Sequence, residues 1–321
     1  LTLPLTTNAK DLFKGCTSFN TDPVLSLPEV TTYESALEGC TSFNSDLTII
    51  APKLTDLTNV LKDATSMSGD ITATLPVIQS LGDLFQSCKS VYNGKLTLDA
   101  ATLSSVEGLF MDCVALNTAP ELTLPLTTNA KHLFKGCTSF NTDMNLTIPM
   151  VTTLESAFEG CTAFNQTVDL TTPSLENVRN LLKNCTAFNG NIFLNTDNVT
   201  TMEGMLEGCE VFDQNLRGLT TTANVTTMKN MLKGCKLFNK NIESLDADSL
   251  TIMESMLEGC EIYDQCLEDL DTANVTNMKN LLKDCVKYNQ CIGALNVQNV
   301  TTMEGMFEGC SLLDQCVDFG Q

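Results

Sequence analysis

The chain has 321 residues, with 39 Asp and Glu against 18 Lys and Arg, which gives a formal charge of −21. This excess of acidic residues argues against a nucleic-acid partner, because binding phosphates requires Lys and Arg gathered on one face. Apolar residues make up 43% of the chain, enough for a packed core, and no apolar run reaches the ~18 residues that suggest a membrane span.

A repeated unit runs along the chain, marked by cysteines that recur at a nearly constant interval, with a single interval of twice that length centred on Ala64. These repeat cysteines are Cys16, Cys40, Cys88, Cys113, Cys137, Cys161, Cys185, Cys209, Cys235, Cys260, Cys285 and Cys310. No linker separates the copies, so we predict a single repeat solenoid over residues 1–321. The chain begins at Leu1 without Met or signal-peptide features, and we expect it to be a segment of a longer array.

Each unit is predicted to contain a short helix. In the last unit the apolar residues follow the i, i+3, i+4, i+7 spacing of one helix face, at Met303, Met306, Phe307 and Cys310. Thr31, three residues before Glu34, is predicted to cap the helix of its unit, and Thr152 and Thr301 are its counterparts. Gly39, directly before a repeat cysteine, is predicted to end the helix.

A corner and a short strand follow each predicted helix. The corner is an aromatic-Asn pair such as Phe43-Asn44, and alternating residues predict strands at 47–49, 146–148 and 192–194. One such unit cannot bury its apolar side chains alone, but stacked units can. We therefore predict an α/β solenoid, a leucine-rich-repeat-like right-handed superhelix of about 13 units, each a short helix plus a short parallel β-strand. Its Phe and Cys columns would fill the core, and its Asn column would bond turn backbone from coil to coil.

Charges alternate in sign from unit to unit, six and two residues before the repeat cysteine. At the second of these positions the inter-repeat charge ladder reads Lys135, Glu159, Lys183, Glu207, Lys233, Glu258, Lys283 and Glu308. The alternation predicts that neighbouring units lie side by side with opposite charges facing, and copying of a unit pair along the gene is the alternative explanation. Because Lys10 and Lys14 make the first unit positive and the last is negative, a second chain stacked head to tail would continue the pattern.

The unit NVTTMEGMFEGCSLLDQCV and its sister NVTTMKNMLKGCKLFNKNI resemble the BspA-like leucine-rich-repeat surface proteins. They are most similar to the branch with the 25-residue repeat V-T-x-M-x-x-M-F-x-x-C-x-x-F-N. The resemblance covers nearly all of the chain and is weakest around Ala64, Cys88 and Cys113, and Leu245 stands where the branch usually has Trp. It implies an extracellular or cell-surface solenoid acting in adhesion, interaction or a structural coat, and it supplies no catalytic residues.

Three further cysteines lie six residues after a repeat cysteine, at Cys266, Cys291 and Cys316. Other units have polar residues there, so these thiols are predicted to point outward. Two of them would pair between coils and leave one, Cys316, for an intermolecular bridge. For the repeat cysteines, buried reduced thiols are the simpler interpretation.

Possible N-glycosylation sites recur with the repeat, at Asn145, Asn165, Asn184, Asn198, Asn224, Asn274 and Asn299. The alternative is that Asn-Val-Thr simply forms the turn that begins each unit. Outward threonines on the strands, at Thr48, Thr72, Thr97, Thr123 and Thr147, suggest ice binding as a further alternative.

Nothing in the sequence predicts catalysis. The single histidine, His132, is expected to face outward, and no Gly-rich phosphate loop, CxxC pair or EF-hand is present. We predict no catalytic, cofactor-binding or metal site.

The sequence therefore predicts a non-enzymatic cell-surface or extracellular structural and adhesive repeat protein, able to assemble head to tail into a filament or coat. The alternative is a binding module that recognises a protein or glycan through its strand face. The expected partners are a protein or glycan at a surface, or the chain itself, with no nucleic acid and no membrane span in this segment.

Overall fold

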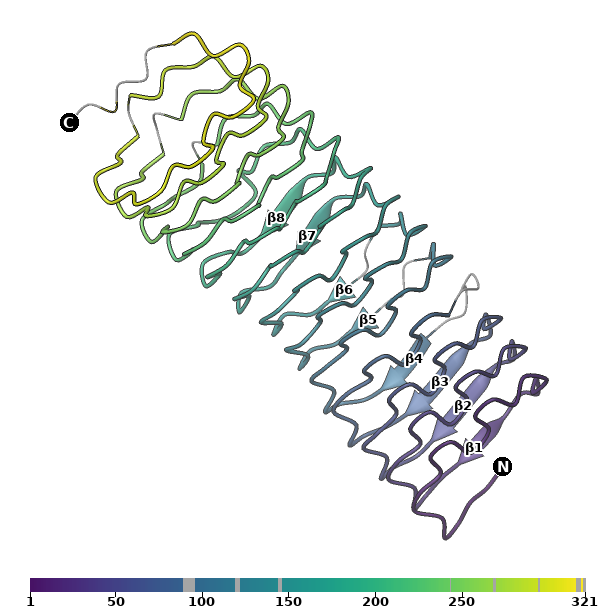
Figure 1. Cartoon of the computed structure of the whole chain (residues 1–321). Helices are drawn as coiled ribbons and strands as arrows, with labels where there is room; N and C mark the ends of the chain where they lie inside the picture. The colour runs from purple at the N-terminus through teal and green to yellow at the C-terminus, as the bar shows by residue number, and fades with distance from the viewer. Residues whose placement is uncertain are drawn as a thin grey trace. The chain divides into compact units, whose positions relative to one another are not determined.

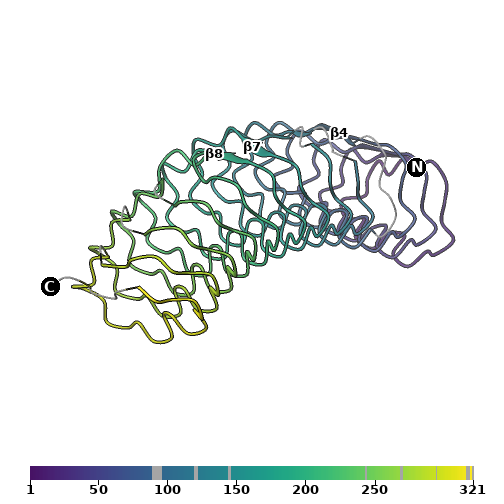
Figure 2. The ribbon, with the colours of Figure 1, turned by 90° about the horizontal axis from the view of Figure 1, so that it is seen from above.

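The computed structural model describes residues 1–88, 96–118, 122–143, 146–242, 244–267, 270–293, 295–315 and 319. The chain forms two compact units, Leu1–Phe164 (unit 1) and Asn165–Gln321 (unit 2). Each unit is a stack of coils, and within each unit the turns of successive coils line up (Figures 1 and 2).

Parallel strands occupy one side of these coils (Figure 1). Unit 1 contains a four-stranded sheet and a two-stranded sheet, made of β1 (Val24–Ser26), β2 (Leu47–Ile50), β3 (Ile71–Thr74) and β4 (Leu96–Asp99), and of β5 (Leu122–Thr123) and β6 (Leu146–Thr147). Unit 2 contains the pair β7 (Val168–Leu170) and β8 (Ile192–Leu194). Every pairing is parallel and joins equivalent residues of successive coils, as in Leu47 with Ile71. The predicted stacking of repeats through short parallel strands is therefore confirmed.

A second column of isolated parallel β-bridges joins successive coils, away from these strands. It joins Asn8 to Thr32 in unit 1 and Asn177 to Thr201 in unit 2, and it continues from coil to coil in each. The architecture is thus a parallel β-solenoid in each unit. The count of about 13 units in one right-handed superhelix stays a prediction.

The predicted helix is wrong, because no helix occurs among the residues that the structure describes. Alternate peptide N–H groups of this segment leave the coil, as when Leu37 N–H donates to Val60 O of the next coil at 3.0 Å. The intervening N–H groups close tight turns, such as that from Cys40 N–H to Leu37 O at 3.1 Å. An α-helix needs all of these groups for its own i to i−4 bonds, so the α/β class is corrected to all-β.

Left-handed backbone conformations make this run of turns possible. Ser35 and Gly39 have φ angles of 55° and 70°, and the equivalent residues five and one before the repeat cysteine have positive φ in the other coils. Both positions hold mainly Gly, Asn, Asp or Ser, which tolerate this conformation best. Gly39 therefore does not end a helix but forms the second of two left-handed corners.

The predicted helix caps are wrong for the same reason. Thr31 Oγ1 donates to the carbonyl of Thr7 in the preceding coil at 3.1 Å, and Thr301 Oγ1 donates to Thr276 O at 2.9 Å. These threonines therefore join coils to one another.

Aromatic and cysteine columns fill the core, as predicted. In unit 2 the rings of Phe188, Phe212, Phe238, Tyr263 and Tyr288 stack with centroids 5.8 to 6.1 Å apart and planes within 7° of parallel. The repeat cysteines of both units are buried, except Cys16 in the first coil of unit 1. Their thiols donate to carbonyl groups of the preceding coil, as from Cys235 Sγ to Leu206 O at 3.2 Å.

The predicted Asn column is confirmed as well. Asn189 Oδ1 accepts from the backbone N–H of Asp213 at 2.8 Å, and Asp213 Oδ1 accepts from that of Asn239 at 2.9 Å. Asp and Asn are interchangeable here because each supplies a short acceptor oxygen, which explains the acidic substitutions in this column.

Candidate functional site

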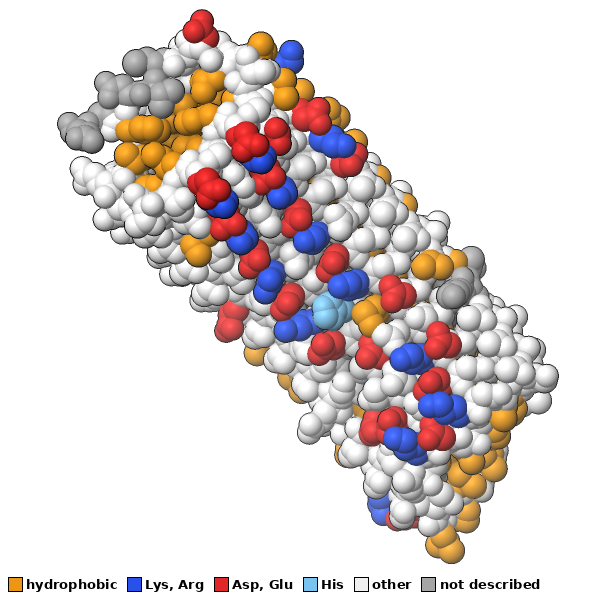
Figure 3. All heavy atoms as spheres, viewed as in Figure 1, with side chains coloured by type: hydrophobic (Ala, Val, Ile, Leu, Met, Phe, Trp, Pro, Cys, Tyr) orange, Lys and Arg blue, Asp and Glu red, His pale blue; other side chains and the backbone are white. Residues whose placement is uncertain are grey.

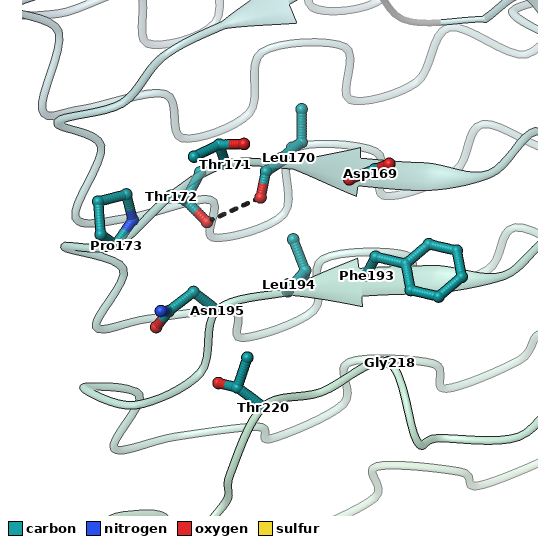
Figure 4. A pocket seen from close by; sticks show the side chains of 10 residues that line it. All are labelled: Asp169, Leu170, Thr171, Thr172, Pro173, Phe193, Leu194, Asn195, Gly218 and Thr220. Atoms are coloured by element: carbon teal, nitrogen blue, oxygen red, sulfur yellow. Dashed lines mark hydrogen bonds between the residues drawn. The ribbon is translucent and has the colours of Figure 1, made fainter.

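The most distinctive feature of the outer surface is an open groove in unit 2, about 270 Å³ in volume. Figure 4 shows that it extends over β7, β8 and the following coil. Its lining residues are Asp169, Leu170, Thr171, Thr172, Pro173, Phe193, Leu194, Asn195, Gly218 and Thr220. Apolar and polar groups thus share one concave surface, which is the usual composition of a ligand site.

The period of the strands determines which side chains face outward. Leu170 and Leu194 are buried, whereas Asp169 and Phe193, one residue earlier on each strand, point outward. These two outward residues are direct partners in the parallel register. The Phe193 side chain is 47% exposed, so an aromatic ring stands in solvent beside a carboxylate.

The next coil passes close beside this ring at Gly218. The coil between Cys209 and Cys235 is longer than the preceding one, between Cys185 and Cys209. In this longer coil, Leu219 forms a parallel β-bridge with Leu194 of β8, and Arg217 and Gly218 directly precede Leu219 in the chain. A Cβ atom on Gly218 would overlap the Ile192 carbonyl oxygen and lie 2.8 Å from Phe193 Cδ1. Glycine therefore lets the backbone pass beside the ring.

A hydrogen-bond network fixes the other end of the groove. Thr220 Oγ1 donates to Asp197 Oδ1 at 2.6 Å and accepts from the backbone N–H of Thr196 at 3.0 Å. The backbone N–H of Asp197 donates to Asn195 Oδ1 at 3.1 Å. These bonds fix the polar side chains at this end of the groove, its polar rim, in the absence of a ligand.

The charge ladder is made of ion pairs between successive coils. The Nζ to carboxylate distances are 3.0 Å for Lys135–Glu159, 3.0 Å for Lys183–Glu207, 3.1 Å for Lys233–Glu258 and 2.9 Å for Lys283–Glu308. Figure 3 shows these opposite charges side by side along each unit. The hydrogen bond to Glu308 raises the pKa of Lys283 above its ordinary value.

The asparagines of the possible glycosylation motifs take part in coil-to-coil bonding. Nδ2 of Asn198, Asn224, Asn274 and Asn299 donates to a carbonyl of a preceding coil at 2.7 to 3.1 Å. These four side chains are exposed. The bonds give the Asn-Val-Thr motif a structural role, and glycosylation stays a prediction.

The remaining motif asparagines differ in their surroundings. Asn165 Oδ1 accepts from Asn189 N–H at 2.7 Å, and Asn184 is one of the left-handed residues, with a φ of 61°. Asn145 lies outside the described residues.

The second set of cysteines lies at the surface of unit 2. Cys266 is a half-buried thiol and Cys291 an exposed one, with its Sγ 3.8 Å from Gln315 Oε1. Cys316 lies outside the described residues. The proposed cross-link stays a prediction.

On the described strands, outward threonines line up in unit 1 and not in unit 2. Thr48, Thr72 and Thr97 pair in register across β2 to β4, and Thr123 pairs with Thr147. In unit 2 the equivalent outward residues are Asp169 and Phe193, so the row of threonines does not extend to that unit. Ice binding stays a prediction for unit 1 alone.

Metal-ligating groups are not clustered in the described part of the chain, where no three His, Cys, Asp or Glu side chains converge. His132, which sequence reasoning placed on the outside, is one of the left-handed residues, with a φ of 54°. Its Nδ1 lies 4.0 Å from Glu107 Oε1.

Sequence reasoning missed Phe193 and Gly218 as site residues. The available signal was an aromatic residue at the outward strand position that holds Val24 in β1 and Thr or Asp in the other described strands, followed by an unusually long coil.

Comparison with known proteins identifies the repeat. The family model described as "Mycoplasma protein of unknown function, DUF285" matches residues 5–93, 55–171, 104–219, 152–258 and 218–318. No curated protein matches the sequence. In structure the chain is similar to a leucine-rich repeat protein from Eubacterium ventriosum, with 14% identity, a TM-score of 0.41, and 90% of this chain and 82% of that chain covered.

The overlapping matches reach from residue 5 to residue 318. The membership of a repeat family predicted from the sequence is thereby confirmed, and the chain belongs to the family described as Mycoplasma protein of unknown function, DUF285.

Proposed function

We propose that this chain is a non-enzymatic adhesive repeat protein, exposed on a cell surface or secreted, that binds its partner through the strand face of unit 2. The observation that carries the proposal is the groove in which the exposed Phe193 ring stands beside Asp169. Exposed aromatic side chains in a fixed setting are typical anchors of binding surfaces, since they bury a large area at a small entropic cost.

The test is adhesion of beads coated with the full chain to immobilised mucin and to a cultured epithelial monolayer. The Phe193→Ala variant should adhere several-fold less than the wild type. Ile50→Ala is a matched control, because Ile50 is 48% exposed on β2 but lies outside the groove. Equal adhesion of the wild type and Phe193→Ala would rule out this face as the binding surface.

A second candidate function is structural, in a filament or coat of this chain. The alternating charges favour it, because a coil with Glu304 and Glu308 stacked on a coil with Lys10 and Lys14 of a second chain would continue the alternation and set the register. Negative-stain electron microscopy distinguishes the two functions. Filaments or sheets of purified chain would support the structural function, and discrete particles at high protein concentration would exclude it.

A further inference from the structure

We propose that the groove binds a neutral glycan, with one pyranose ring stacked on the exposed face of Phe193. This inference rests on the proposed adhesive function and names its ligand class. The groove volume of about 270 Å³ is slightly below the range typical of drug-sized ligands, about 300–1,000 Å³, and suits a single sugar residue.

The Phe193 ring is a fixed apolar platform. Its strand neighbours Ile192 and Leu194 are each only 2% exposed, so the backbone of β8 is anchored in the core. The Gly218 backbone packs closely beside the ring, and any side chain at this position would meet the Ile192 carbonyl oxygen and the ring. The face of an aromatic ring is negative, and the C–H groups on one face of a pyranose carry small positive charges, so the two surfaces attract.

Polar groups beside the platform match the hydroxyl groups of a sugar. Asp169 lies across from Phe193 in the strand register and offers carboxylate acceptors, and the exposed Thr171 offers a hydroxyl on the same coil (Figure 4). An aliphatic side chain of a protein partner would remove water from the Asp169 carboxylate without replacing its hydrogen bonds, which is unfavourable. A sugar replaces those bonds while its apolar face covers the ring.

The charges around the groove favour a neutral ligand. Asp169 lines it and Asp197 belongs to its hydrogen-bonded rim, whereas Arg217 is the basic residue beside Gly218. The chain as a whole carries a charge of −21. Sulfated or sialylated glycans would therefore be repelled from the Asp169 side of the site.

The binding experiment uses the full chain and defined oligosaccharides. Saturation-transfer NMR and titration calorimetry would compare cellohexaose, chitohexaose, xylohexaose and mannohexaose with a heparin hexasaccharide. A single shallow subsite should give a Kd on the order of 1 mM for at least one neutral oligosaccharide. The heparin fragment should bind more weakly.

Variants link that binding to the groove. Phe193→Ala should weaken it at least tenfold, Phe193→Trp should retain it, and Thr171→Val should weaken it several-fold without changing the apolar platform. Ile50→Ala should bind as the wild type does. Circular dichroism of each variant checks that the fold persists, and Thr171→Val remains informative if Phe193→Ala fails to fold.

The possible failures are distinguishable. If no neutral oligosaccharide binds, or if heparin binds more tightly, while adhesion to mucin or cells still requires Phe193, the ligand class is wrong and the adhesive surface stands. If adhesion is also independent of Phe193, the proposed function fails together with the inference.

Discussion

The buried cysteine column should make the fold sensitive to alkaline pH. Cys209, Cys235, Cys260 and Cys285 are completely buried in unit 2, and burial raises the pKa of each thiol above its ordinary value. The folded protein therefore keeps these thiols protonated at a pH at which the unfolded chain ionises them.

The sign of the effect follows from this difference. An unperturbed cysteine has a pKa of about 8.5, so the contribution of these thiols to stability is fully present below about pH 8.5 and is lost progressively as the pH rises toward their folded-state pKa values. Each buried thiol then costs about 1.4 kcal/mol per pH unit, or about 2 kcal/mol by pH 10. For the four thiols the loss is about 8 kcal/mol, comparable to the whole stability of a typical domain, about 5–15 kcal/mol. We expect unit 2 to unfold near pH 10.

Urea unfolding followed by circular dichroism, in the presence of a reducing agent at pH 7 to 10, measures this loss. The control variant is Cys235→Ala, because the chain itself has Ala64 at this position in the column. The variant should be less stable at pH 7, and its stability should fall less steeply above pH 8.5, by about 1.4 kcal/mol per pH unit. An unfolding free energy that stays constant from pH 8.5 to 10 would refute the reasoning.

Three further predictions concern the columns. Tyr263→Phe should stabilise the protein by about 1 kcal/mol in urea unfolding, because the buried Tyr263 hydroxyl has no hydrogen-bond partner among the described residues; a loss of stability would show that a partner is present. Lys233→Glu and Glu258→Lys should each destabilise by less than about 1 kcal/mol, and the double variant should recover the loss; no recovery would exclude coupling between the two positions. Asn239→Ala should cost about 1–2 kcal/mol through its lost acceptor oxygen, whereas Asn239→Asp keeps that acceptor and should lose less, through repulsion by Asp213 and Asp264 on either side; equal losses would contradict the proposed role of that oxygen.

The stacking was predictable because it depends on equivalent residues recurring at a nearly constant interval. Phe188, Phe212 and Phe238 follow the repeat cysteine at the same distance, so any in-register stack brings their rings together. The Asn column followed from the same reasoning. Neither result depends on the secondary structure of the residues between.

The helix was mispredicted because two structures share its apolar spacing. Met303, Met306 and Phe307 can lie on one face of a helix or on the inner side of successive turns. The distinguishing residues are Gly305 and Gly309, which have φ angles of 65° and 80°. Small or αL-tolerant residues at the same two positions of every unit indicate left-handed corners, whereas a helix would not require them.

The groove could not be predicted because a local exception creates it. A repeat pattern emphasises what the units share, and the shared residues are those that join coils: the Thr, Asn and Cys side chains that donate to or accept from neighbouring backbone. The Phe193 side chain and Gly218 do not belong to these side-chain columns, although the Gly218 carbonyl accepts from the Leu194 N–H at 3.1 Å. The longer coil that holds Gly218 also departs from the common interval.

The difference between the shared inward columns and the variable outward positions explains why the outer strand face is the best place to look for function. Replacing an inward residue disturbs both neighbouring coils, so the chemistry of the columns is confined to a few residue types. Outward strand positions do not have this restriction, and they hold Thr72 in β3, Asp169 in β7 and Phe193 in β8. Packing does not require an exposed aromatic ring, and its burial by a partner would be favourable, which is why the proposed binding function is tested at Phe193.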